Sequence, residues 1–304
     1  MPLYFIIFMV FLQHNSMFPQ PRSVAHRLNK SINGQVLNAS DQTKIPYATI
    51  IHANKRKGFN TNEEGAFVLE WQGEPDTLYI SSVGYNDTLF VLNQKSYQAN
   101  LTIKLKPKIV VLNELKIINK APKQKSYTTI KGKSSGIYGG LGGDIKSLLG
   151  LYFTESFVLG KHLASVHFYI DKKGIVKAPF KVRIFDFDKT KPIKELSTQN
   201  IVVTPYKNGW NEFDVSGYNI IIPENGCLVA MEWLNIIDKH PTEYQKGRDK
   251  YNYMYLGLCY IGDEHRGFIK TNLENWYSVK EINPKSPDYK KWYYLNPMIR
   301  ITVD

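Results

Sequence analysis

Two groups of His, Asp and Glu residues have types and spacing that could support chemistry. His240 and Glu243 stand three positions apart, the spacing of an HxxE zinc-binding pair, and the pair would need His265 as its third ligand. Asp263, Glu264 and His265 are consecutive and could perform acid–base chemistry or hold a metal. Adjacent polar residues at a hairpin tip are usually only solvated. We therefore expect no catalytic centre and interpret the protein as one that is not an enzyme.

A candidate metal site lies at Asp186 and Asp188, which flank Phe187 at the end of an expected strand. Strand alternation points both carboxylates to one side, where they could hold calcium together with backbone oxygens. Calcium takes about six to eight oxygen ligands, and two carboxylates are too few. Calcium therefore stays a possibility at this pair, and nothing in the sequence requires a cofactor.

Aromatic residues gather between His240 and Asn296. Flat rings stack on sugar faces and anchor protein interfaces, although many of these rings belong to strands and would pack in a core. Four of them stand beside Asn, Pro and Lys residues in loop-like sequence: Trp276, Tyr277, Trp292 and Tyr293. We expect these four to contact a ligand, and core packing remains the alternative.

The composition of the chain indicates its fold class. At about 150 residues per domain, 304 residues predict two domains, and 43% hydrophobic content is sufficient for buried cores. The chain holds 20 Tyr, 15 Phe and 5 Trp among scattered Val, Ile and Thr, a composition that favours pleated sheets. Lys and Arg number 39 against 27 Asp and Glu, a net charge of +12. We expect an all-β protein with a basic bias.

The amino end carries an apolar run, LYFIIFMVFL, from Leu3 to Leu12. Ten residues are too few for the roughly 20 that span a bilayer, but they suit a signal-peptide core, so no stable membrane span is expected. Residues 1–25 would be the signal peptide, with a cut after Ala25. No Lys or Arg precedes the run, which leaves a misassigned initiator or an uncleaved anchor open. The expected location is the periplasm, the outer-membrane surface or the medium.

The only cysteines, Cys227 and Cys259, sit in apolar, strand-like runs. They could form a disulfide in an oxidising compartment or remain small buried hydrophobes, and we favour two buried free thiols. No CxxC or CxxH spacing accompanies them, so they predict no zinc site.

Short strands with closely spaced turn signals follow the leader, in the rhythm of a β-sandwich. The sharpest turn is Asn62–Gly65, where Asn62 can cap the turn through its side chain and Gly65 takes a positive φ. Gly34, Gly58, Gly65 and Gly84 each stand where a strand must turn or where a residue with a Cβ would be strained. Residues 32–105 follow, in order, most of the pattern IxGxV, then PxPxAxV, then GxxTNxxGxFxL, then DTLxISxxGY. The residues that carry it are Ile32, Gly34, Val36, Ile45, Pro46, Tyr47, Ala48, Thr61, Asn62, Gly65, Phe67, Leu69, Asp76, Thr77, Leu78, Ile80, Ser81, Gly84 and Tyr85.

In this pattern the segment resembles the carboxypeptidase-regulatory-like domain. The resemblance implies a seven-stranded, transthyretin-like β-sandwich over residues 30–118, a non-catalytic module found beside carboxypeptidase domains and at the amino end of TonB-dependent outer-membrane receptors. One loop departs from the family pattern, because NASDQTKIPY has no Gly where DxxTGEPL is usual.

A lysine-rich strap runs from Lys104 to Lys133, with nine lysines and a single glutamate. Clustered lysines attract nucleic acid, acidic lipid or anionic glycan. A solvated, self-repelling linker explains them without any partner, and we expect a basic linker over residues 119–136. For an exported chain, nucleic acid is not an expected partner.

Residues 137–304 predict a second sandwich. Val166, Phe168 and Ile170 alternate with polar neighbours, and Phe180, Val182 and Ile184 repeat this arrangement. The strands expected here are LYFTESFVL, LASVHFYI, APFKVRIFDFD, KPIKEL, NIVVTPY, GWNEFDVSGYNIIIP, CLVAMEWL, YMYLGLCYIG, RGFIKT and PMIRITVD. Their order resembles the jelly-roll, galactose-binding-like accessory domains of bacterial envelope proteins, which implies binding more than catalysis.

Taken together, the sequence predicts a non-enzymatic, exported binding or assembly module of a Gram-negative cell envelope that engages a partner protein. The alternative is a carbohydrate-binding accessory protein in polysaccharide use. Envelope proteins and glycans are the expected partners.

Overall fold

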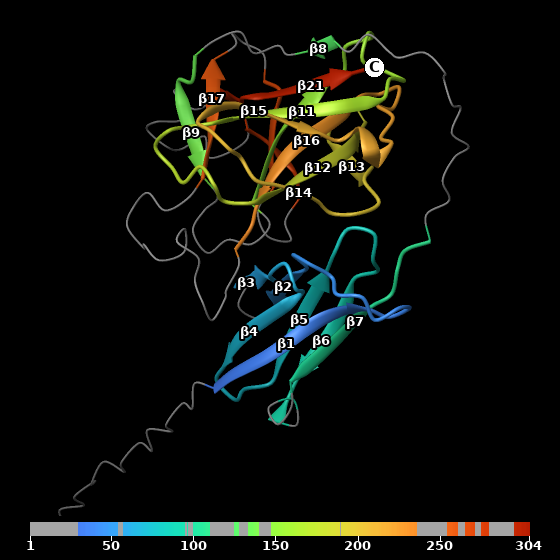
Figure 1. Ribbon diagram of the computed structural model, residues 1–304, viewed down its shortest axis with the longest axis vertical. Coiled ribbons are helices and arrows are strands. Elements are labelled where there is room, and N and C mark those ends of the chain that lie inside the picture. The colour runs from blue at the N-terminus through green and yellow to red at the C-terminus, as the bar shows by residue number, and fades with distance from the viewer. Residues whose placement is uncertain are drawn as a thin grey trace, which may run out of the picture.

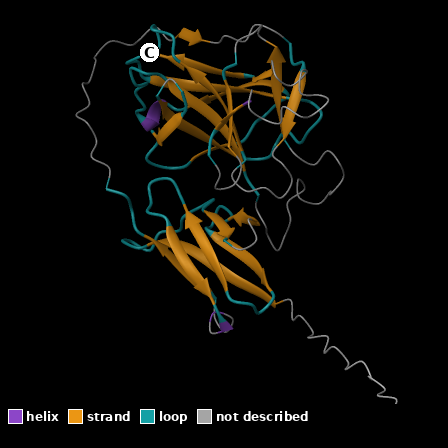
Figure 2. Ribbon diagram, turned by 180° about the vertical axis from the view of Figure 1, so that it is seen from behind, coloured by secondary structure: helices purple, strands orange, loops and turns teal. Residues whose placement is uncertain are grey.

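The computed structural model describes residues 30–53, 57–94, 96, 100–109, 125–127, 133–139, 147–188, 190–235, 254–260, 265–270, 275–279 and 295–304. Two β-sandwiches are stacked along the long axis of the molecule, with β1 to β7 in one and the later strands in the other (Figure 1). Seen from behind, strands fill both bodies and loops face each other where the bodies meet (Figure 2). The expectation of an all-β protein is confirmed.

The first sandwich consists of one three-stranded and one four-stranded sheet. The three-stranded sheet contains, in spatial order, β4 (Ala66–Trp71), β1 (Lys30–Asn38) and β7 (Leu101–Leu105). The four-stranded sheet contains, in spatial order, β3 (Lys57–Asn60), β2 (Thr49–His52), β5 (Asp76–Ser81) and β6 (Thr88–Leu92). Only the β1–β7 pair is parallel among these strands. The seven strands agree with the sandwich that the resemblance implied.

Alternation fills the core of the first sandwich. Along β5, Leu78 and Ile80 are fully buried while the alternate residues Thr77 and Tyr79 are partly exposed, as expected for a strand with one face on a core. The turn into β4 has the predicted geometry. The side-chain oxygen of Asn62 accepts backbone N–H bonds from Glu64 at 3.0 Å and Ala66 at 2.9 Å, and Gly65 has a φ of +66°.

The second sandwich pairs two seven-stranded sheets. The first sheet contains β13 (Pro192–Glu195), β12 (Phe180–Phe187), β16 (Cys227–Trp233), β10 (Leu148–Phe153), β18 (Gly267–Lys270) and β19 (Tyr277–Ser278), with β14 (Ile201–Val203) also beside β12. The second contains β20 (Leu295–Pro297), β17 (Tyr255–Tyr260), β11 (Leu163–Ile170), β21 (Ile299–Val303) and β8 (Lys125–Tyr127), with β15 (Gly209–Asp214) beside β11 and β9 (Gly136–Gly139) beside β17. The chain crosses repeatedly between the sheets, as in a jelly roll.

The predicted alternation of the second sandwich is confirmed on its core side. Val166, Phe168 and Ile170 of β11 face Phe180 and the next alternate residues of β12 in one apolar cluster. Phe168 and Phe180 meet edge to face, with their ring centroids 5.0 Å apart.

Three expectations for this half of the chain need correction. The strand LYFTESFVL ends at Phe153, because residues 156–160 turn and leave the ladder. The long strand expected over residues 209–223 ends at Asp214, and Ser216–Tyr218 form the 3₁₀ helix η2. Part of the predicted linker over residues 119–136 is a strand, since β8 pairs with β21 and closes an edge that β21 would otherwise leave open.

Cys227 and Cys259 are not joined in a disulfide, and both are buried, as favoured from the sequence. Burial, followed by the charges of Glu155 and Asp186, raises the pKa of the Cys227 thiol to about 12. This thiol is therefore neutral at physiological pH and acts as a small apolar side chain.

Within the described residues, no helix is long and apolar enough to cross a membrane.

Acidification should destabilise the second sandwich through His167 of β11. The His167 ring is hydrogen-bonded to Thr302 at 2.8 Å and lies 3.7 Å from Glu212. Burial and then the Arg300 charge lower the pKa of His167, with Glu212 opposing them. The unfolded chain therefore binds more protons between the lowered pKa and about 6.5, so stability is full above that window and is lost as the pH falls through it. Thermal melts between pH 7.5 and 5 should show a falling midpoint.

The variant His167→Gln should flatten this acid dependence while leaving the melting temperature at pH 7.5 within a few degrees, because glutamine keeps a donor and an acceptor but does not titrate. An unchanged pH profile in this variant would assign the acid sensitivity to other groups.

Candidate functional site between the two sandwiches

The outer face of the β10–β12–β16–β18 sheet carries charged side chains in register. Cα pairing places Lys181 beside Glu232, Glu232 beside Leu148, and Leu148 beside Lys270, which makes one row across four strands. Arg183 on β12 lies in the next row. Because side chains alternate along a strand, all of these project away from the core.

An ion-pair network links the charges of this row. The Lys181 ammonium lies 3.5 Å from a carboxylate oxygen of Glu232, and the Arg183 guanidinium contacts the other oxygen of that carboxylate. Arg183 also donates from Nε to Glu195 at 2.9 Å, and the Ser197 hydroxyl donates to Glu195 at 2.7 Å. Lys181 and Glu232 are 2% and 0% exposed, so something other than water covers this outer face.

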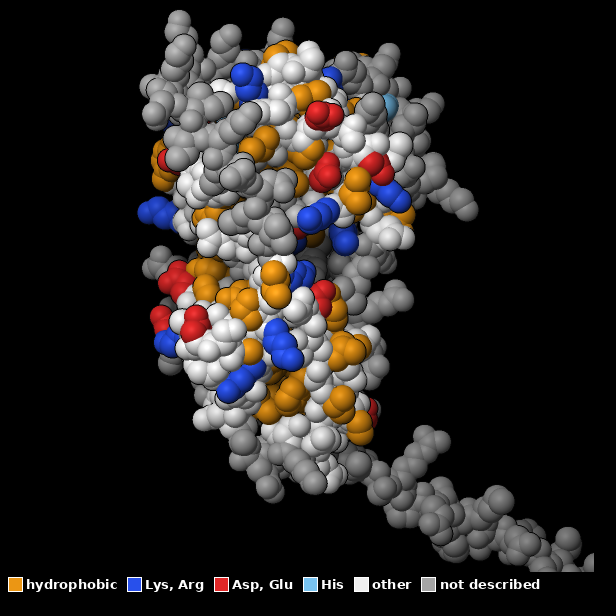
Figure 3. Space-filling view, turned by 90° about the vertical axis from the view of Figure 1, so that its right-hand side faces the viewer, with side chains coloured by type: hydrophobic (Ala, Val, Ile, Leu, Met, Phe, Trp, Pro, Cys, Tyr) orange, Lys and Arg blue, Asp and Glu red, His pale blue; other side chains and the backbone are white. Residues whose placement is uncertain are grey.

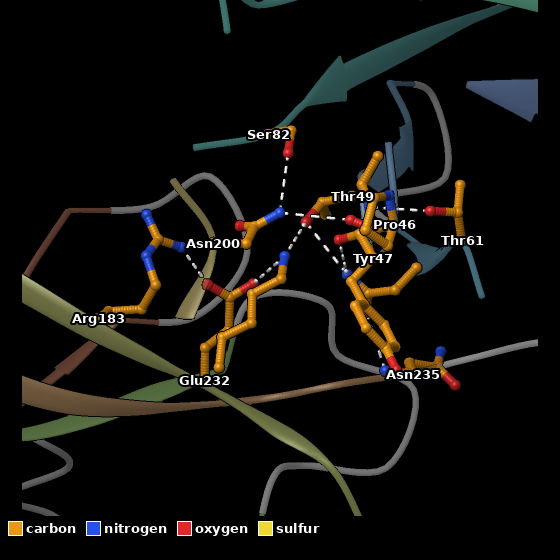
Figure 4. A network of polar contacts seen from close by, with 12 residues as sticks. Pro46, Tyr47, Thr49, Thr61, Ser82, Arg183, Asn200, Glu232 and Asn235 are labelled. Carbon is orange, nitrogen blue, oxygen red and sulfur yellow. Dashed lines mark hydrogen bonds and ion pairs between the residues drawn. The ribbon is translucent and has the colours of Figure 1, made fainter. Parts of the chain in front are cut away.

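The first sandwich covers this outer face of the sheet. Thr49 of β2 accepts a hydrogen bond from the Lys181 ammonium at 3.4 Å across the domain boundary. The side chain of Asn200 donates to the Ser82 hydroxyl at 2.9 Å and to the Pro46 carbonyl at 3.3 Å. Figure 4 shows this network, with Glu232 beside Arg183 and Asn200 reaching toward Ser82 and Pro46.

Two asparagines, Asn60 and Asn235, form reciprocal hydrogen bonds across the boundary between the two sandwiches. The Asn60 backbone N–H donates to the Asn235 carbonyl at 2.7 Å, and the Asn235 backbone N–H donates to the side-chain oxygen of Asn60 at 2.9 Å. The Asn235 amide also donates to the Gly58 carbonyl at 3.0 Å. Gly84 lies close to the second sandwich, because a Cβ there would meet the Thr198 carbonyl at 2.2 Å. The two sandwiches are therefore held together by polar contacts at several points.

A cavity of about 750 Å³ opens beside these contacts. Figure 3 shows blue Lys and Arg side chains gathered around the hollow where the two bodies meet. Strand ends and loops of both sandwiches line it. The first contributes Thr49, Tyr79, Ser81, Ser82, Val83, Gly84, Asn86, Asp87, Lys108 and Ile109; the second contributes Lys181, Arg183, Lys194, Glu195, Leu196, Ser197, Thr198 and Lys270.

Burial sets the protonation behaviour of the groups around the cavity. Desolvation lowers the pKa of Lys181, and Glu232 partly offsets that effect. Desolvation and the nearby Arg183 charge lower the pKa of Lys270, and the Glu232 charge opposes them. On the facing wall, burial raises the pKa of the Tyr79 phenol, and its hydrogen bond to Asp87 acts in the same direction. The cavity is thus a partly desolvated site with hydrogen-bonding groups on both walls.

The structure places two of the four aromatic residues expected to bind ligand. Trp276 is partly buried and packs edge to face on Phe185, with their ring centroids 5.1 Å apart. The Lys270 ammonium lies 6.0 Å from the Trp276 ring centroid. Tyr277 pairs with Ile269 in β19 and is 42% exposed. Trp276 therefore stands beside the cavity wall and packs on the outer face, whereas Tyr277 belongs to a sheet edge.

The candidate calcium pair lies at the end of β12. One oxygen of the Asp188 carboxylate accepts N–H bonds from Thr190 at 2.9 Å and Lys191 at 2.8 Å, together with the Thr190 hydroxyl. These bonds lower the pKa of Asp188 and cap the turn into β13. Asp186 stands opposite Cys227 in the ladder. Across the described ranges, no three His, Cys, Asp or Glu side chains gather as a metal site.

The other predicted site residues fall outside the described residues. They are Trp292, Tyr293, His240, Glu243, Asp263 and Glu264. Of the expected acid–base group only His265 is described, and it is partly exposed.

Sequence reasoning missed the residues that form the cavity. Lys181, Arg183 and Glu232 stand at polar positions of otherwise apolar strands, and this alternation predicts an outward face. It does not reveal that another domain covers the face. Glu195, Ser197 and Lys270 had no sequence signal beyond their polarity.

Comparison with known proteins supports the first half of the chain. Residues 32–117 match the family model described as a CarboxypepD_reg-like domain, so this part of the chain contains such a domain. The match extends past the resemblance recognised over residues 32–105. No curated protein matches the chain.

Among solved structures, the chain is similar to the cysteine protease and lectin-like domains of Cwp84, a surface-layer-associated protein of Clostridium difficile, at 11% identity and a TM-score of 0.41. This likeness covers 91% of the chain and 59% of the other, so the chain spans less than two thirds of that protein. A variant of the clostridial cysteine protease Cwp84 after propeptide cleavage gives 11% identity and a TM-score of 0.42, over 91% and 70% of the two chains. Similarities this distant carry no argument about activity.

Proposed function

We propose that the protein is an exported, non-catalytic binding module of a Gram-negative cell envelope, and that it holds a saccharide in the cavity between its two sandwiches. The observation that carries this proposal is the cavity itself, about 750 Å³ in volume and lined by side chains of both domains. Ligand sites commonly measure about 300–1,000 Å³ and often lie at domain interfaces. The apolar run at Leu3–Leu12 and the CarboxypepD_reg-like domain support export and an envelope setting.

The lining favours a saccharide over an apolar ligand. Hydroxyl and amide groups stand on both walls, and sugars present a ring of hydroxyls that pair with such groups. The cavity hydroxyls and amide belong to Thr49, Tyr79, Ser81, Ser82, Asn86, Ser197 and Thr198.

A glycan array probed with the wild-type protein and two matched variants tests this function. Asn86→Trp places a bulky ring at an exposed position of the cavity lining, whereas Asn208→Trp makes the same change at an exposed turn away from it. We expect glycans that bind the wild type and Asn208→Trp but lose most of their signal with Asn86→Trp. A blank array, or binding indifferent to Asn86→Trp, would contradict the proposal. Binding lost only with Trp276→Ala would move the site to the aromatic face.

A protein partner is the second candidate, because β6 is an edge strand with apolar side chains facing water. Leu89 is 67% and Val91 60% exposed, and β6 ends the four-stranded sheet. An open edge of this kind can accept a strand from another chain. A photo-crosslinker at Val91 should capture one envelope protein, and a crosslinker at exposed Lys172 should not; equal capture at both positions would rule out β6 as the docking strand.

A further inference from the structure

The geometry points to an anionic ligand: the cavity selects a saccharide that carries a carboxylate or a sulfate, and Lys270 is the cation that contacts it. This inference rests on the proposed function and names the charge class of its ligand.

The first step is the pairing of the charges on the cavity wall. Glu232 is shared between Lys181 and Arg183, and Glu195 is also bound to Arg183. The carboxylates of Glu232 and Glu195 are thus paired with the cations of Lys181 and Arg183. Lys270, on the same face, has no carboxylate within ion-pair distance among the described residues. Lys108 and Lys194 also lack a described ion pair, but both are exposed, so Lys270 is the partly buried cation of the lining that no described ion pair takes up.

The second step is the charge of the whole cavity. Its described lining contains five cationic side chains, Lys108, Lys181, Arg183, Lys194 and Lys270, against only two carboxylates, Asp87 and Glu195. Even with Glu232 behind the wall counted, the cations are in excess. A cleft lined mainly by one sign of charge concentrates ions of the opposite sign, and partial desolvation strengthens that attraction.

The third step is the surroundings of Lys270. Burial and the Arg183 charge lower the pKa of Lys270, and the Glu232 charge opposes them only in part, so an anion placed between the two cations would favour the ammonium form further. Arg183 is held on two sides by carboxylates, so its guanidinium is fixed in place and little order is lost when a ligand approaches. The partly buried Trp276 ring beside Lys270 offers a flat surface next to the proposed charge contact.

Calorimetric titration of the full chain with matched sugars tests the inference. The probes are a trimer of galacturonic acid, a sulfated chondroitin-type disaccharide, a neutral galactose trimer and inorganic sulfate alone. We expect the two anionic sugars to bind at least about tenfold tighter than the neutral trimer. Their affinity should fall as the salt concentration rises, since screening weakens charge pairing.

Substitution of Lys270 separates a direct contact from general attraction. Lys270→Gln should lower the affinity for the anionic sugars by about tenfold. Lys172→Gln removes the same charge from an exposed turn outside the cavity and should lower that affinity by less than about twofold. Melting temperatures of both variants should stay within a few degrees of the wild type, because Lys270 forms no ion pair among the described residues and Glu232 keeps its contacts with Lys181 and Arg183.

The possible outcomes are distinct. Equal affinity for neutral and anionic trimers, still lost with Asn86→Trp, overturns the charge class and keeps the proposed function. Anion binding unchanged by Lys270→Gln overturns the role of Lys270. If no sugar binds, both the proposed function and this inference are wrong. If sulfate binds but no sugar does, the cavity attracts small anions only, and the proposal of a saccharide ligand is wrong.

Discussion

Gly84→Ala should separate the two sandwiches, whereas Gly73→Ala should not. Both glycines flank β5 in turns, and both have a φ of +84°. A Cβ at Gly84 would meet the Thr198 carbonyl of the other sandwich at 2.2 Å, while nothing lies within 4 Å of a Cβ at Gly73. The backbone strain is therefore matched, about 1–2 kcal/mol in each case, and only Gly84→Ala adds a clash between domains.

Small-angle scattering and ligand binding measure this difference. For Gly84→Ala we expect a larger radius of gyration and loss of cavity binding, because the Asn200–Ser82 hydrogen bond beside this turn would also break. Gly73→Ala should keep the wild-type radius and affinity and lose only about 1–2 kcal/mol in its free energy of unfolding. Identical scattering curves for the two variants would show that the contact at Gly84 does not hold the domains together.

Glu232→Gln should be the most destabilising single substitution on the outer face. It leaves the buried Lys181 ammonium without its carboxylate, 3.5 Å away, and removes one of the two carboxylates that contact Arg183. Removing one partner of a buried ion pair costs about 3–5 kcal/mol, since the remaining charge stays desolvated. The free energy of unfolding, followed in urea by tryptophan fluorescence with Trp71 of the first sandwich replaced by Phe in both proteins, should fall by about that amount.

Two companion variants make the result interpretable. Glu212→Gln alters a carboxylate that is 58% exposed and lies 3.7 Å from the His167 ring, which is neutral at pH 7.5, so it should change stability at that pH by less than about 1 kcal/mol. The double variant Lys181→Met/Glu232→Gln should recover part of the loss, because the uncompensated ammonium is gone and Arg183 keeps Glu195. If Glu232→Gln behaved like Glu212→Gln, the Lys181–Glu232 pair would not be desolvated in solution.

These two predictions bear on the cavity because the same residues build it. Lys181, Arg183 and Gly84 line the space in which we propose that a saccharide binds, and Glu232 orders two of them. A variant that weakens the contact between the two sandwiches should therefore also weaken ligand binding. A ligand that touches both walls would in turn stabilise the closed arrangement.

Much of each sandwich could be predicted from the sequence. Val166, Phe168 and Ile170 indicate a core-facing strand by alternation, and Asn62 with Gly65 indicates a turn, because both signals depend only on the local backbone geometry of a few neighbouring residues. The family pattern over residues 32–105 likewise indicated a seven-stranded sandwich.

Local signals failed where a residue's partner lies far along the chain. The segment LYFTESFVL at residues 151–159 reads as one strand, yet the strand ends at Phe153. Lys125–Tyr127 reads as linker, yet it pairs with β21. Sheet pairing between distant segments decided both cases, and no local propensity encodes it.

The sequence by itself determined an all-β chain, its first domain and the inward and outward faces of its strands. Only the tertiary structure decided that the outward face at Lys181 and Glu232 is covered by the first sandwich and beside a cavity. Thr49 and Lys181 are 132 positions apart, and Asn60 and Asn235 are 175 apart. Alternation along a strand determines which side chains leave the core, but the docking of another domain determines whether they meet water or a partner.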